Sequence, residues 1–159
     1  QIPPTKIVSA QEVPEPQRTL LVHEDDMTPT LEQYYSSEVQ LKVLDKQVAP
    51  LNLRRLVTLH VSGGKAVLFG AIDIDLNTLP ASSHQDVLEC IKPFGAILRE
   101  HKVVDRSQPQ SFFELPCDCV MQEALMLKHR WNLFGRVNQL IRDDDSVIVR
   151  VVEILPKAQ

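Results

Sequence analysis

Apolar residues stand at alternate positions of the segment 53–61, and this pattern restricts the fold more than any other feature of the chain. Leu53, Val57, Leu59 and Val61 fall on one side, which predicts a β-strand, because successive side chains of a strand point to opposite faces. The sequence Ser62-Gly63-Gly64-Lys65 that follows is typical of a tight hairpin turn. It leads into a further strand over 66–76, so the chain is expected to build an antiparallel sheet.

Other segments extend this picture. Alternation predicts strands over 39–43, 112–115, 133–142 and 147–155, the last two joined by a turn at 143–146. A short helix is expected from Thr28, a suitable N-cap with Pro29 at the first helical position. A second helix fits residues 82–91, before a turn at Phe94-Gly95. Consecutive hairpins with few helices predict an α+β fold, a single antiparallel β-sheet with short helices on one side.

Length and proline content suggest the domain organisation. At 159 residues the chain is expected to form one domain. Four of its 11 prolines lie within the first 16 residues, which is typical of an extended, weakly ordered segment. We therefore predict a leader over residues 1–17 and a single folded domain over residues 18–159.

Composition excludes several classes of partner. A net charge of −4 argues against nucleic acid, which is bound through excess positive charge. No apolar run approaches the roughly 18 residues of a membrane-spanning helix, so no membrane insertion is expected. Three cysteines do not form a disulfide framework, and the first residues do not resemble a secretory signal, so we expect a cytoplasmic protein. The oligomeric state stays open, with a monomer favoured.

Arg55 interrupts the apolar face of the strand over 53–61. A buried arginine is costly unless an anion meets it. One interpretation is an ion pair with a carboxylate of the core. The other is a clamp for a ligand carboxylate or phosphate, which the guanidinium can bind with two hydrogen bonds.

Glu153 is the corresponding exception on the last strand, in a row with Val149 and Val151. Burial should raise the pKa of its carboxyl unless a cation such as Arg55 offsets the effect, and such a group can act as a general acid or base. A simple ion pair with Arg55 is the competing interpretation. The residues alone do not separate the two.

Other motifs carry less weight. Cys117-Asp118-Cys119 lacks the second pair of ligands that zinc sites use, so no metal is expected. The glycines do not show the spacing of a phosphate-binding loop, and no triad can be assembled without arbitrary choice. We predict a protein without cofactors.

The order of the segments resembles the chorismate lyase (chorismate-pyruvate lyase) family, over roughly residues 25–156. The match consists of short motifs in sequence order: Asp26-Met27-Thr28 with Leu31-Glu32, the strand that carries Arg55, Ala71–Leu79, Pro93-Phe94-Gly95, and Leu133-Phe134-Gly135-Arg136 followed by Glu153 and Leu155-Pro156. The segment 95–101 differs from the best-known bacterial branch and resembles a divergent, cyanobacterial type. None of these motifs is decisive singly, and together they are specific.

The resemblance implies an activity and a site. Family members convert chorismate to 4-hydroxybenzoate and pyruvate without a cofactor, at the start of ubiquinone or plastoquinone synthesis. Arg55 resembles the arginine that holds the ring carboxylate, and Glu153 the catalytic carboxylate. Met27, Phe94 and Gly95 fall in the flap-like segments that cover a buried pocket and contact the ligand. Glu153 stands one residue nearer the final proline than in the family, so we expect a β-bulge near the strand end.

Two alternatives remain. Effector-sensing domains of GntR-type transcription regulators share this architecture, so the chain could be a non-catalytic sensor that binds a small carboxylate. Against this, the sequence shows neither a helix-turn-helix nor a basic face. An interaction or scaffold protein with a core ion pair between Arg55 and Glu153 is the other alternative.

Overall fold

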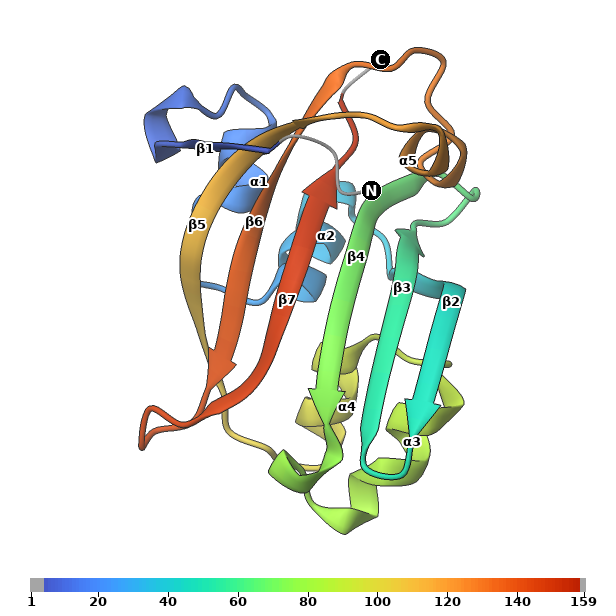
Figure 1. Ribbon diagram of the computed structural model, residues 1–159, viewed down its shortest axis with the longest axis vertical. Helices are drawn as coiled ribbons and strands as arrows, with labels where there is room; N and C mark the ends of the chain where they lie inside the picture. The colour runs from blue at the N-terminus through green and yellow to red at the C-terminus, as the bar shows by residue number, and fades with distance from the viewer. Residues whose placement is uncertain (1–4, 158–159) are drawn as a thin grey trace.

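The computed structural model describes residues 5–157, and within this range seven strands form one antiparallel sheet in the order β1-β5-β6-β7-β4-β3-β2 (Figure 1). The strands are β1 (Lys6–Val8), β2 (Gln40–Ala49), β3 (Asn52–His60), β4 (Ala66–Asp75), β5 (Arg106–Pro116), β6 (Asn132–Ile141) and β7 (Val147–Leu155). The predicted α+β fold with a single antiparallel sheet is confirmed.

The hairpin between β3 and β4 forms where the sequence places it. Gly63 and Gly64 both have positive φ, of 91° and 87°, a conformation that glycine adopts without steric cost. The strands β2 and β5 are longer than predicted. Most side chains of β2 beyond Val43 are exposed, so this edge strand shows no alternation that the sequence could reveal.

Helices cover both faces of the sheet unequally. The helices are α1 (Gln17–Leu21), α2 (Met27–Tyr35), α3 (His84–Glu89), α4 (Phe94–Glu100) and α5 (Cys119–Ala124), with 3₁₀ turns at Ala10–Glu12, Leu76–Thr78 and Ala81–Ser83. Side chains of α1 to α4 pack on the face that carries Leu53 and Leu59, behind the sheet in Figure 1. Met121 of α5 instead packs with Phe69 on the opposite face. The expectation of helices on one side therefore holds for α1 to α4 and is wrong for α5.

The N-terminal segment belongs to the sheet. Lys6–Val8 form β1, which pairs with Glu114–Phe112 of β5, and Val13 is fully buried. The prediction of a weakly ordered leader is therefore wrong for residues 5–17, while residues 1–4 lie outside the described range. Proline content misled the prediction, because an edge strand of three residues tolerates prolines on both sides.

Two boundaries near the later site also differ from expectation. Asp26, not Thr28, is the N-cap of α2. The expected turn at Phe94-Gly95 is the first turn of α4, which follows Pro93 directly. None of the helices within residues 5–157 combines the length and apolar composition that a membrane crossing requires.

Candidate ligand-binding site

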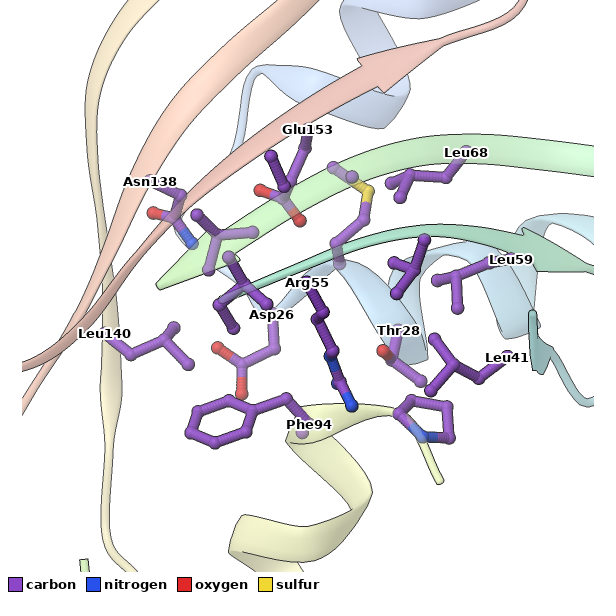
Figure 2. A pocket seen from close by; sticks show the side chains of 18 residues that line it. Asp26, Thr28, Leu41, Arg55, Leu59, Leu68, Phe94, Asn138, Leu140 and Glu153 are labelled. Carbon is purple, nitrogen blue, oxygen red and sulfur yellow. The ribbon is translucent and has the colours of Figure 1, made fainter. Parts of the chain in front are cut away.

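A cavity lies between the helix-covered face of the sheet and the first turns of α2 and α4 (Figure 2). The space inside it is about 650 Å³ when the open solvent at its mouth is included. Most of its wall is apolar and comes from the strands: Leu41, Val57, Leu59, Leu68, Ile72, Leu140 and Val151. Its polar side chains are Asp26, Thr28, Arg55, Asn138 and Glu153.

Arg55 reaches this cavity from β3, on the apolar face that alternation predicts. It is only 5% exposed, and its Nε and Nη1 atoms have no hydrogen-bond partner within residues 5–157. Arg54, one residue earlier, points to the other face and pairs with Asp73 at 2.9 Å. One arginine of the pair is thus bound on the surface, and the other keeps donors free beside an apolar cavity.

Glu153 lines the same cavity from β7 but does not pair with Arg55, so that interpretation is wrong. Its Oε1 accepts a hydrogen bond from Arg136 Nε at 2.8 Å. Burial raises the pKa of the Glu153 carboxyl, while the positive charge of Arg136 and its hydrogen bond oppose the rise. Glu153 is therefore a buried carboxyl that already forms an ion pair with Arg136.

Arg136 is the residue that sequence reasoning missed at this point. Its side chain is fully buried, and besides Glu153 it donates to the backbone oxygens of Leu21 at 3.3 Å, His23 at 3.0 Å and Asp25 at 3.0 Å. It thereby fixes the segment between α1 and α2 to the sheet. A signal for the ion pair was present, because counting outward from the predicted turn at 143–146 places residue 136 opposite residue 153.

The register of β7 differs from the sequence-based expectation. Its pairing with β4 is continuous from Val149 to Ile154, so the predicted bulge near Glu153 is absent. The irregularity in this hairpin lies near the turn, where the pairing shifts between Leu140 and Ile141. Glu153 faces the cavity in the ordinary alternation of the strand, so no bulge is needed to place it there.

Met27, Phe94 and Gly95 all line the cavity, at the first turns of α2 and α4. The two turns lie close together, since a Cβ atom on Gly95 would stand 3.9 Å from Thr28 Oγ1. The structure thus brings these three residues together with Arg55 and Glu153. Their roles toward a ligand remain predictions.

Asp26 and Asn138 complete the polar wall, and sequence reasoning assigned neither of them to the site. Ser107 Oγ donates to Asp26 Oδ1 at 2.6 Å and accepts from Asn138 Nδ2 at 3.1 Å. Asn138 shares a strand face with Arg136 and Leu140, so a polar residue in an otherwise inward row was the available signal. Asp26 entered the sequence analysis only as part of the motif Asp26-Met27-Thr28.

One group of possible metal ligands within the described residues lies outside this cavity. Atoms of Asp86, Glu100 and His101 lie within 4.8 Å of one another, and His101 Nε2 contacts Asp86 Oδ2 at 2.7 Å. The hydrogen bond between His101 and Asp86 and the ion pair between Glu100 and Lys92 account for this proximity. All three cysteines, Cys90, Cys117 and Cys119, are free.

Comparison with known proteins bears on the fold. No protein-family model matches the chain, and no curated protein matches its sequence. PhnF from Mycobacterium smegmatis has a similar structure, with a TM-score of 0.64 and 11% identity over 84% of this chain and 64% of PhnF. The effector domain of PhnF alone gives a TM-score of 0.60 at 10% identity, over 82% of this chain and 87% of that domain.

A ligand-binding domain from Bordetella bronchiseptica, of a protein described as a GntR-family transcriptional regulator, gives a TM-score of 0.58 at 9% identity. The match covers 76% of this chain and 87% of that one. The chain spans less than two-thirds of the length of PhnF. At these identities the likeness establishes the fold alone. The chain thus has a single-sheet α+β fold, similar to that of the PhnF effector domain and of the Bordetella bronchiseptica ligand-binding domain.

Proposed function

We propose that this domain binds a small organic acid in the cavity, with the ligand carboxylate on Arg55. The observation that carries the proposal is the buried guanidinium with unpartnered Nε and Nη1 beside an apolar wall. A buried charge without a partner lowers stability, and a carboxylate would supply both the opposite charge and two acceptors. The similarity to effector and ligand-binding domains supports the same function.

Chorismate lyase activity is the second candidate, supported by the presence of Arg55 and Glu153 in one cavity. In this reaction Arg55 would hold the ring carboxylate while the C–O bond to the pyruvate unit breaks. Glu153 would hydrogen-bond the 4-oxygen as it becomes a phenol, or move the ring proton. No cofactor is needed, because formation of the aromatic ring drives the reaction.

The ion pair between Glu153 and Arg136 favours ligand binding over catalysis as the function of the cavity. An acid–base residue must exchange a proton with the substrate, whereas this carboxylate accepts from a fully buried arginine that also holds three backbone oxygens. Such a network favours a fixed, ionised group. It fits an oriented hydrogen-bond acceptor better than a proton shuttle.

One experiment separates the two candidates. The protein is titrated with 4-hydroxybenzoate in a calorimeter and separately incubated with chorismate, with 4-hydroxybenzoate followed by absorbance and pyruvate by a coupled assay. Binding without turnover supports the ligand-binding domain, and turnover at a rate proportional to protein concentration supports the lyase. If neither ligand binds and no product forms, both candidates are wrong for this class of acid.

A further inference from the structure

The cavity has a second polar region beside Arg55, formed around the carboxyl group of Asp26. Asp26 is the N-cap of α2, yet its side chain does not cap the helix. It turns into the cavity instead, and Figure 2 shows the Asp26 carboxyl and the Arg55 side chain both pointing toward α4. A short polar residue that leaves a helix cap unfilled is free for another contact.

The hydrogen bonds around Asp26 run in one direction. Asn138 donates to Ser107, and Ser107 donates to Asp26. Asn138 is 2% exposed and Ser107 5% exposed, so solvent contributes little here. The Oδ1 atom of Asn138 is buried without a partner among residues 5–157. This region therefore offers acceptor oxygens, and a buried acceptor without a donor is unfavourable.

Asp105 interacts directly with the Asp26 carboxyl. Burial, the negative charge of Asp26 and a hydrogen bond to its side chain raise the pKa of Asp105 to about 7, against the weaker opposing effect of Arg99. The Asp105 carboxyl therefore keeps its proton to a higher pH than an ordinary aspartate does. Asp26 thus lies between the Ser107 hydroxyl, which donates to it, and the Asp105 carboxyl.

The two polar regions of the cavity are complementary in chemistry. Arg55 provides only donors, whereas the Asp26 carboxyl and the unpartnered Oδ1 of Asn138 provide acceptors. Apolar side chains such as Val57 and Ile72 line the same cavity. Glu153 adds no free charge, since Arg136 is paired with it. A ligand that satisfies both regions carries a carboxylate and a hydrogen-bond donor on a compact apolar frame.

We propose that Asp26 is a specificity-determining residue that accepts a hydrogen bond from a hydroxyl group of the acid whose carboxylate binds Arg55. Ser107 and Asp105 act as positioning residues for Asp26. The inference rests on the proposed binding function and adds the ligand class to it: acids that carry a hydroxyl group on a compact apolar frame, rather than acids without one.

The test compares acids that differ only in the hydroxyl group. Benzoate, its 2-, 3- and 4-hydroxy derivatives and the matching methoxy compounds are titrated into the wild-type protein, Asp26→Ala and the matched control Asp25→Ala. Asp25 is the exposed neighbouring carboxylate, so its removal changes the net charge equally without touching the cavity. The wild type should bind the best hydroxy acid roughly tenfold or more tightly than benzoate, the usual range for a hydrogen bond to a charged group.

Asp26→Ala should abolish this preference while keeping the affinity for benzoate within about threefold, and Asp25→Ala should retain the preference. Ser107→Ala, which leaves Asp26 in place but removes its donor, should reduce the preference partially and serves if Asp26→Ala does not fold. A preference that survives Asp26→Ala, or an equal loss for benzoate, overturns the role of Asp26. A wild type that binds all these acids equally overturns it too, while leaving the proposed function intact. Absence of binding by any acid contradicts the proposed function itself.

Discussion

Arg136 and Glu153 stand directly opposite each other on β6 and β7, and the Nε–Oε1 hydrogen bond of 2.8 Å joins two side chains that are 0% and 7% exposed. The pair lies on the inner face of the sheet. Arg136 also holds the segment that leads into α2 through hydrogen bonds to three backbone oxygens. The pair also explains why the cavity contains one unpaired cation and not a neutral pair of Arg55 with Glu153. The Nε and Nη1 atoms of Arg55 are therefore available to a ligand carboxylate.

Removal of Arg136 should destabilise the domain strongly. In Arg136→Met the Glu153 charge stays buried without its partner and three backbone oxygens lose their donor, so we expect a loss of about 3–5 kcal/mol in the free energy of unfolding. Denaturant unfolding measures it. Arg54→Met removes an exposed pair and should cost less than about 1 kcal/mol. Equal losses in the two variants would refute a structural role for the buried pair.

Gly135 should not tolerate a side chain. A Cβ atom there would lie 2.5 Å from the Glu153 backbone oxygen and 2.6 Å from Phe113 Cζ, so β6 would have to separate from β7. Gly135→Ala should lose about 1–3 kcal/mol or more of stability. Gly95→Ala, whose new Cβ meets only atoms at 3.9 Å or beyond, should be neutral or slightly stabilising within α4. Thermal unfolding of both variants decides this, and a stable Gly135→Ala would show that the strand spacing is wrong.

The N-terminal segment contributes to stability. Val13 is fully buried, whereas Ile7 in β1 is 67% exposed. Val13→Ala should therefore cost about 1–2 kcal/mol, and Ile7→Ala should change the free energy of unfolding by less than about 0.5 kcal/mol. If both substitutions are silent, residues 5–17 do not pack against the domain in solution.

Asp105 should make stability depend on pH. Its pKa of about 7 in the folded protein lies above the ordinary value of 3.8, so the unfolded chain releases this proton at lower pH than the folded one. Raising the pH from about 4 to 7 thus destabilises the wild type relative to a variant that cannot ionise. Asp105→Asn should gain about 1 kcal/mol on the wild type across this window, roughly 3 °C in Tm, after allowance for partial exposure. A Tm difference that is constant from pH 4 to pH 8 would contradict the raised pKa.

Local sequence patterns predicted the strands that have one buried and one more exposed face. Alternation in β3 located Arg55 on the inner face, and the glycines of the hairpin fixed its turn. Where both faces are exposed, as in much of β2, the pattern carries no information about the strand. The segment β1 was missed because three residues are too few to show a period.

To predict which charged residues pair, one needs the register between the strands, and this register depends on the whole hairpin. The face of Glu153 followed from its own strand, but its pairing with Arg136 depends on how β6 and β7 align. Asp105 and Asp26 are farther apart in the chain and meet only through tertiary packing, so no local pattern predicts the raised pKa of Asp105. Alternation thus located single inward charges. The pairing of Arg136 with Glu153 could be found from the predicted turn, whereas the contact between Asp105 and Asp26 required the fold.

The central claim is that the free guanidinium of Arg55 binds a carboxylate, and calorimetric titration of 4-hydroxybenzoate into Arg55→Leu and Arg54→Leu tests it most directly. The two arginines are adjacent in sequence but lie on opposite faces of β3, so the variants change the net charge equally. Loss of a charge-assisted, two-point contact should weaken binding by Arg55→Leu at least about 30-fold relative to the wild type. Arg54→Leu should stay within about twofold. Unchanged affinity in Arg55→Leu, or an equal loss in Arg54→Leu, would contradict the account.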